Sequence, residues 1–184
     1  MTIASLTFDD MYAVIGREGV ALERYATKLG PMFLGATDKG LCLLEFTDRK
    51  MLETEFRHLR KRLNAAFIPG TNEHINQAKR ELDEYLEGQR TTFSLTLVAP
   101  GTDFQKDVWQ ALQKIPYGET RSYKEQAKMI GRPKAVRAVA NANGMNRIAI
   151  VIPCHRVIGA DGTLTGYGGG LARKKFLLEL EAKH

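Results

Sequence analysis

Two capping boxes in the second half of the chain define where helices begin. In a capping box, a Ser or Thr caps the start of a helix, and a Glu or Gln three residues later hydrogen-bonds back to it. Thr102 and Gln105 form the first box, and the apolar residues that follow recur at helical spacing, which predicts a helix over residues 104–115. Ser122 and Glu125 form the second box.

The second capping box opens a helix-turn-helix candidate. It predicts a short helix over residues 123–130 that ends at Gly131, then a helix over residues 133–144 with proline first and glycine last. Two short helices joined by a tight turn are typical of DNA-binding units, but they also occur as plain packing pairs. The second helix is rich in alanine and carries Arg137, so either a DNA groove or a neighbouring helix could approach it closely.

The first half has the pattern of a small α/β unit. Cys42 alternates inside an apolar strand and is interpreted as a core residue. The expected fold class is α+β: a small N-terminal α/β domain over residues 1–97, then a mainly helical C-terminal domain over residues 98–184. That second domain contains the helix-turn-helix and a short strand leading to a cysteine. The predicted strands of the first half cover residues 23–29, 32–37, 41–46 and 91–98, with a Gly-Pro turn between the first two, and its predicted helices cover residues 49–67 and 73–88.

An apolar run in the second half ends at a nucleophile. Residues 148–152 are mostly β-branched, which predicts a buried strand, and Pro153 follows directly before Cys154 and His155. A thiol attacks as the thiolate, so it needs a base or a positive charge nearby. Adjacent residues of an extended segment point to opposite sides, so a water or a local turn must connect the two side chains. The glycine-dense residues 159–171 then form either a ligand-facing backbone or a flexible loop.

Charge and composition indicate an anionic partner and a reducing compartment. From Val98 onward the chain has 14 Lys and Arg against 7 Asp and Glu, whereas the residues before it are nearly balanced. This basic half favours nucleic acid as the partner. Two cysteines argue against a disulfide framework and a four-ligand zinc site. The chain shows no signal peptide and no apolar stretch of the ~20 residues that a membrane span needs, so we expect a cytoplasmic protein without membrane contact.

The second half closely resembles the O6-alkylguanine-DNA alkyltransferases, also called methylated-DNA–protein-cysteine methyltransferases. The resemblance runs in order through FQKDVWQALQKIPYGETRSY, GRPKAVRAVANANGMN, VIPCHRVIG and GYGGGLARKKFLLELE, and it covers nearly all of residues 100–181. The first half resembles the family only loosely, through RYATKLGPMFLGATDKGLC. The chain departs from the family at Arg147, where proline often follows the hinge asparagine, and its cysteines do not support the zinc site of some members.

The resemblance implies four catalytic residues. Cys154 would be the alkyl acceptor, and His155 would act through a water as its base. Glu181 matches the carboxylate that orients this histidine. Asn146 matches the hinge asparagine that ties the recognition helix to the active-site segment.

The resemblance also implies a DNA surface and a base pocket. Arg137 would fill the space left by a flipped base, and Tyr123 would help to rotate the target phosphate and then hydrogen-bond the base. Lys124 and Arg132 are assigned to the same DNA-binding surface. The implied pocket residues are Val157, whose backbone would read the guanine edge with that of Cys154, and the wall residues Tyr167, Gly168 and Gly169.

The implied function is DNA repair by direct damage reversal. The protein would present its recognition helix to the minor groove of double-stranded DNA and flip out an O6-alkylguanine, with O4-alkylthymine as a second candidate lesion. It would transfer the alkyl group irreversibly to its own Cys154, once per molecule, because a thioether has no easy leaving path. The resemblance implies no cofactor and no metal, and we expect a monomer.

Three alternative functions differ in what they require. A non-catalytic alkyltransferase-like protein binds damaged DNA but replaces the acceptor cysteine, which this chain retains. A transcriptional regulator of this type needs a cysteine-rich metal module and additional chain. A hydrolytic Cys–His enzyme would turn over rapidly on small acyl substrates, whereas an alkyltransferase would be inactivated by one reaction.

Overall fold

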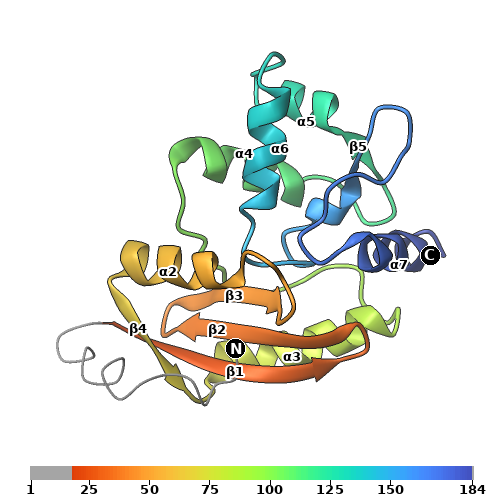
Figure 1. Ribbon diagram of the computed structural model, residues 1–184. Helices are drawn as coiled ribbons and strands as arrows, with labels where there is room; N and C mark the ends of the chain where they lie inside the picture. The colour runs from red at the N-terminus through yellow and green to blue at the C-terminus, as the bar shows by residue number, and fades with distance from the viewer. Residues whose placement is uncertain (1–17, 184) are drawn as a thin grey trace.

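The computed structural model describes residues 18–183, and its N-terminal half is built on a four-stranded sheet (Figure 1). The strands are β1 (Glu18–Thr27), β2 (Gly30–Thr37), β3 (Gly40–Phe46) and β4 (Ala65–Pro69), in the order β3-β2-β1-β4. β1 to β3 pair antiparallel, and β4 lies parallel to β1. The N-terminal segment without the pattern of a signal peptide, residues 1–16, lies outside the described residues. Within residues 18–183, no helix has the length and apolarity needed to cross a membrane.

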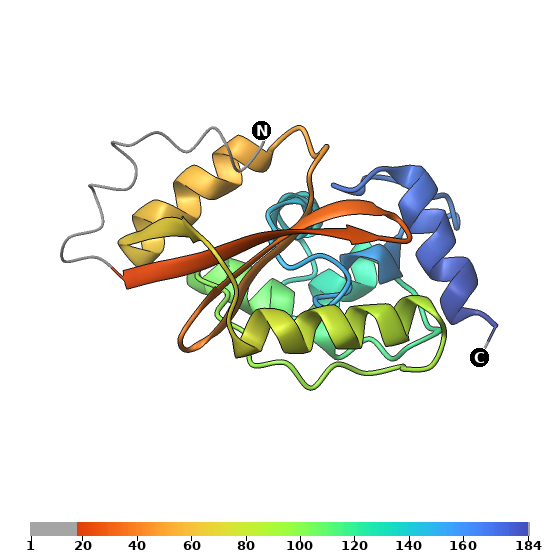
Figure 2. The same ribbon diagram turned by 90° about the horizontal axis from the view of Figure 1, so that it is seen from below.

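Helices cover both faces of this sheet (Figure 2). Along β2, Met32 points to one face and Phe33 to the other, as the two-residue period of a strand requires. The face with Met32 packs against α3 (Glu73–Leu86), and the face with Phe33 packs against α2 (Leu52–Leu63). Cys42 lies on the α2 side and is 1% exposed, which confirms the prediction that it is a core residue.

Besides an earlier start of β1 and a later start of α2, three features of the N-terminal half differ from the sequence predictions. The helix predicted over residues 49–67 ends early, because Asn64 takes a left-handed φ of 45° and the following residues pair with β1 as β4. Residues 91–98 form no regular strand and retain one bridge, between Leu97 and Leu41. The turn between β1 and β2 falls at Lys28 and Leu29, before the expected Gly-Pro pair.

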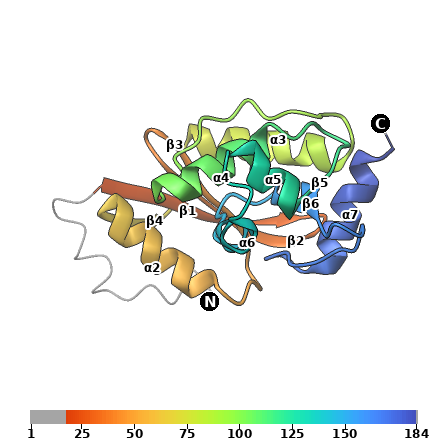
Figure 3. The same cartoon turned by 90° about the horizontal axis from the view of Figure 1, so that it is seen from above.

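The C-terminal half is mainly helical, as predicted. Both capping boxes are present, so these helix starts are confirmed. The last helix of the helix-turn-helix begins at Val136 and not at residue 133, because Ala135 N–H bonds to the carbonyl of Arg132 and closes a turn around Pro133. The elements are α4 (Asp103–Gln113), β5 (Arg121–Ser122), α5 (Tyr123–Met129), α6 (Val136–Gly144), β6 (Val157–Ile158) and α7 (Leu171–Glu181). Figure 3 shows α4, α5 and α6 grouped together, with α7 to one side.

The edge of β3 joins the two halves. Leu41 exchanges backbone hydrogen bonds with residues 96 and 98, and Leu44 does so with residues 147 and 149. Ile148 makes its bridge to β3 here, but the strand predicted over residues 148–152 does not continue, since Ile150 has a φ of 72° and the chain turns. The short strand near the cysteine is β6, which pairs with β5. The edge of the sheet therefore positions the segment that leads to Cys154.

Candidate active site

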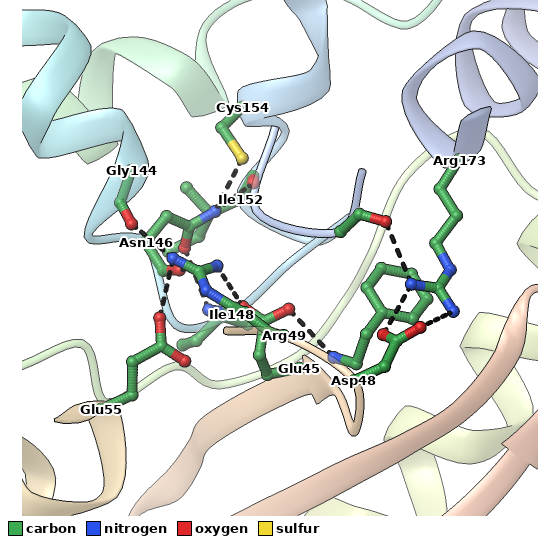
Figure 4. Close-up of polar contacts among 12 residues, drawn as sticks. Glu45, Asp48, Arg49, Glu55, Gly144, Asn146, Ile148, Ile152, Cys154 and Arg173 are labelled. Carbon is green, nitrogen blue, oxygen red and sulfur yellow. Dashed lines mark hydrogen bonds and ion pairs between the residues drawn. The ribbon is translucent and has the colours of Figure 1, made fainter. Parts of the chain in front are cut away.

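Cys154 begins a single 3-10 turn, η2 (Cys154–Arg156), and Asn146 holds its sulfur (Figure 4). Nδ2 of Asn146 donates to Sγ of Cys154 at 3.4 Å and to the carbonyl of Ile152 at 2.8 Å. Oδ1 of Asn146 accepts from the N–H of Ile148 at 3.0 Å. Asn146 is 1% exposed, so it is a buried link between the end of α6 and the cysteine.

His155 lies behind the cysteine and is fully buried. Its Nε2 is 2.8 Å from Oε1 of Glu181, while its Nδ1 has no hydrogen-bond partner among residues 18–183. Burial lowers the pKa of His155, and the neighbouring Glu181 carboxylate opposes this shift. At neutral pH His155 is therefore a neutral base that can take up a proton.

Glu181 is the centre of a buried network that reaches into the N-terminal half. Arg156 donates from Nε to Oε2 at 2.9 Å and from Nη2 to Oε1 at 2.9 Å, and the N–H of Gly118 donates to Oε2 at 3.1 Å. The hydroxyl of Tyr85, on α3, donates to Oε1. Burial raises the pKa of Glu181, but the hydrogen bonds from His155 and Arg156 outweigh burial and lower the pKa to about 2. Glu181 is thus ionised beside His155.

The low pKa of Glu181 predicts an acid-sensitive fold. Because the folded-state pKa of about 2 lies below the ordinary value of 4.5, this carboxylate stabilises the fold above pH 4.5, and its contribution is lost as the pH falls toward 2. The expected loss is about 3 kcal/mol in the free energy of unfolding. Urea unfolding of the wild type and Glu181→Gln across this range measures it. The stability difference between the two should shrink on acidification, and a constant difference would contradict the assignment.

Opposing effects act on the pKa of the Cys154 thiol. Burial raises the pKa of the thiol, while the hydrogen bond from Asn146 lowers it. The Glu45 carboxylate also raises this pKa, and the cations Arg49 and Lys174 lower it. The thiol is therefore protonated at rest, and it needs a base when it attacks.

Lys174 holds the glycine-rich segment in place. It is fully buried, and its Nζ donates to the carbonyls of Val157 at 2.5 Å, Thr165 at 2.9 Å and Gly166 at 3.3 Å. Lys174 lies near the start of α7 beside two other basic residues, but its own side chain is not solvated. Val157 is fully buried, and a carbonyl oxygen has a second lone pair, so its carbonyl can still accept another hydrogen bond.

The three predicted wall residues lie together beside the N-terminal half. A Cβ on Gly169 would lie 2.7 Å from the ring of Phe46, so only glycine fits there. The hydroxyl of Tyr167 is buried and has no hydrogen-bond partner among the described residues. A cavity of about 540 Å³ is bounded by residues 48–51 and by the wall from Tyr167 to Gly170.

The four predicted DNA-binding residues divide into one near the site and three on the surface. The hydroxyl of Tyr123 donates to the carbonyl of Thr165 at 2.9 Å, beside the pocket wall. Lys124 on α5 and Arg137 on α6 are exposed. Arg132 is also exposed, and its guanidinium lies 5.3 Å from the ring centroid of Phe104.

Sequence reasoning missed several residues of this site. Tyr85 and Arg49 come from the N-terminal half, and nothing in their local sequence connects them with Cys154. Arg156 could have been identified from the sequence, because it directly follows His155. Lys174 lies in a cluster of basic residues that resembles an ordinary exposed helix face.

Two family models match the chain. Residues 21–99 match "6-O-methylguanine DNA methyltransferase, ribonuclease-like domain", and residues 103–183 match "6-O-methylguanine DNA methyltransferase, DNA binding domain". The methylated-DNA–protein-cysteine methyltransferase of Methanosarcina barkeri is 50% identical over 153 residues, which are 83% of this chain and 91% of the relative. The relative of the same name from Mycobacterium tuberculosis is 49% identical over 153 residues, 83% of this chain and 87% of its own length.

Solved structures are similar over most of the chain. The crystal structure of Mycobacterium tuberculosis O6-methylguanine methyltransferase has a TM-score of 0.76 and 44% identity, and the match covers 89% of this chain and 93% of that one. The structure of Mycobacterium tuberculosis OGT in complex with DNA has a TM-score of 0.75 and 44% identity, covering 90% of this chain and 93% of that one.

Proposed function

The chain belongs to the 6-O-methylguanine DNA methyltransferase family, and from this premise we propose that Cys154 is the residue that accepts the alkyl group. The chain is a DNA-repair protein that binds DNA and transfers an alkyl group to a cysteine of its own. One observation carries the assignment of Cys154. Its thiol is partly accessible, and the next residue, His155, is buried and neutral and forms a hydrogen bond with Glu181. Cys42 is enclosed in the core and has no such neighbour.

The proposed reaction is an in-line displacement at the alkyl carbon. Nδ1 of His155 takes the proton of the Cys154 thiol through a water, and the sulfur attacks the alkyl carbon. The S–C bond forms as the C–O6 bond breaks, and the electron pair of that bond passes to the guanine, which takes up a proton and is released. Glu181 stabilises the imidazolium that forms, because a carboxylate on the opposite ring nitrogen orients and balances it. The thioether has no easy leaving path, so each molecule reacts once.

We propose that the helix-turn-helix delivers the lesion to this site. A stacked base cannot bring its O6 substituent to a thiol inside the protein, so the nucleotide must be extruded at a cost of a few kcal/mol. The exposed α6 would enter the minor groove with Arg137 in the space left by the base, while Lys124 and Arg132 meet phosphates. Tyr123 would exchange its bond to Thr165 for one to the base.

Several finer points belong to the same proposal. The preferred lesion is O6-alkylguanine, and the pocket is formed by Tyr167, Gly168, Gly169 and the backbone of Val157. The protein acts as a monomer. The division into domains lies between residues 97 and 98. A cytoplasmic location fits two cysteines that are both free thiols.

Mass spectrometry tests the proposed function directly. The wild type is incubated with duplex DNA carrying one O6-methylguanine, and the intact protein and its peptides are weighed. The expected product carries a single methyl group on the Cys154 peptide and saturates at one per protein. A protein that binds the lesion DNA but stays unmodified would be a recognition module, and turnover on acyl substrates would identify a hydrolase.

Arg137→Ala is expected to slow repair of duplex DNA selectively. Without the side chain that occupies the vacated space, part of the flipping cost is no longer offset, and the rate constant on lesion duplex should fall roughly tenfold or more. The reaction with free O6-benzylguanine, which requires no flipping, should be unchanged. Arg24→Ala removes an exposed arginine from β1 and is the control for charge. An equal loss of rate on both substrates would show that Arg137 does not fill the space left by the base.

A further inference from the structure

Arg49 lies buried between the two halves of the protein. It belongs to the loop between β3 and α2, and its side chain is 7% exposed. Its Nη1 lies 2.5 Å from Oε2 of Glu45, and its Nη2 lies 2.8 Å from Oε1 of Glu55. Burial raises the pKa of both carboxyl groups, that of Glu55 to about 8, and the charge of Arg49 opposes this shift in both.

The same two nitrogens also donate to backbone carbonyls of the C-terminal half (Figure 4). Nη2 donates to the carbonyl of Gly144, the last residue of α6, and Nη1 donates to the carbonyl of Asn146 at 3.3 Å. The side chain of Asn146 in turn binds Cys154. A guanidinium presents its donors in one rigid plane, so Arg49 holds the end of α6 and the hinge in a fixed relation.

The glycine-rich wall packs against the same guanidinium. A Cβ built on Gly168 would collide with the guanidinium atoms of Arg49, so the backbone of the wall lies directly against them. Arg49, Gly144 and Gly168 also line the same cavity of about 540 Å³. A single side chain of the N-terminal half therefore touches the helix end, the hinge and the pocket wall.

Fold stability does not account for this cluster. Removing one guanidinium and two carboxyl groups from water is costly, and apolar side chains of similar volume often give equal stability. The best-attested use of buried ionic groups is to select one arrangement among several. The Arg49 charge also favours the thiolate form of Cys154.

We propose that Arg49 is a positioning residue for alkyl transfer: it anchors the end of α6 and the Gly168 wall to the sheet, so that Asn146 holds Cys154 in line with the extruded base. The proposal rests on the proposed role of Cys154 as the acceptor. It gives the N-terminal half a part in the reaction geometry, although none of its residues needs to touch the reacting atoms.

Single-turnover kinetics on duplex DNA with one O6-methylguanine test this proposal. Arg49→Met alone would leave the buried Glu45 without its cation, so the double variant Glu45→Gln/Arg49→Met is used to preserve the fold. Arg49→Lys keeps the charge, but one ammonium group cannot hold both carbonyls and both carboxyl groups in the same plane. Both variants should react about 10- to 100-fold more slowly than the wild type, since small misplacements of reacting groups have effects of this size.

The matched control is Arg90→Met. Arg90 also interacts with two carboxylates and a carbonyl: its Nε lies 2.7 Å from Glu84, and its Nη1 lies 3.6 Å from Glu81 and 3.0 Å from the carbonyl oxygen of Thr92. These partners all lie in the N-terminal half. The control should therefore keep the wild-type rate constant.

Rate constant and final extent distinguish positioning from folding. An irreversibly misfolded fraction lowers the final extent and leaves the rate constant unchanged, whereas lost positioning lowers the rate constant while the reaction still reaches one alkyl group per protein. Reversible unfolding lowers the rate constant only in proportion to the folded fraction, which a urea unfolding curve of each variant measures. Hydrogen exchange of residues 144–148 should also increase in both Arg49 variants. Wild-type rate constants in both variants would overturn the proposal. A wild type that is not alkylated at Cys154 would instead overturn the proposed function itself.

Discussion

Cys154→Ala is expected to abolish alkyl transfer completely while the protein still binds lesion DNA. The proposed reaction consumes the sulfur as its acceptor, and no other described side chain occupies its position beside Asn146 and His155. Because Cys154 lies at a partly accessible edge of the core, its loss should change the free energy of unfolding by only about 1–2 kcal/mol. The measurements are intact mass after incubation with O6-methylguanine duplex and a binding assay on the same DNA.

Cys42→Ala is the matched control for this prediction. Cys42 is the other cysteine of the chain, and its Sγ lies 3.4 Å from the carbonyl of Gly35 inside the sheet core. The substitution should cost a similar amount of stability and leave alkyl transfer intact. Methylation at Cys42 in the Cys154→Ala variant, or full transfer by that variant, would contradict the assignment of the acceptor.

Glu181→Gln is expected to slow alkyl transfer by about three orders of magnitude. An amide can still hydrogen-bond Nε2 of His155, but it cannot balance the imidazolium charge, and it can impose the wrong tautomer. Removal of the orienting carboxylate from a catalytic triad slows the reaction at least as much. The variant should also lose about 3–5 kcal/mol of stability, because Arg156 is left as a buried charge without its anion. The rate should therefore be measured at a temperature at which the variant is folded.

The pH dependence separates the two effects of Glu181→Gln. A loss of stability alone would lower the amount of reactive protein and leave the pH dependence of the rate constant unchanged. Loss of the carboxylate should move the pH dependence, because this group opposes the lowering of the His155 pKa. A variant with a wild-type rate constant and pH profile would show that Glu181 is only a structural residue.

Features with a local physical cause were predictable from the sequence. The two capping boxes depend on side chains and backbone groups three residues apart, so Thr102 and Ser122 mark helix starts in any surroundings. The two-residue period of a strand decides which face of the sheet Cys42 points to. Cys154 and His155 are consecutive in the sequence, and the motifs around them were sufficient to identify the family.

Features set by distant contacts were decided only by the tertiary structure. Residues 65–67, predicted as the end of a helix, became part of a strand because β1 offered a parallel partner. Residues 148–152 were apolar enough for a strand, but the edge of β3 accommodates only a short bridge before Ile150 turns the chain.

The same distinction applies within the candidate site. Tyr85, Arg49 and Lys174 reach it from elements whose own sequences are ordinary. Hydrogen bonds across 96 and 97 residues of chain place Tyr85 on Glu181 and Arg49 on the carbonyl of Asn146. Sequence alone determined which cysteine and histidine stand together, because that depends on covalent neighbours. The fold determined which charges surround them, because packing brings together groups that the chain keeps far apart.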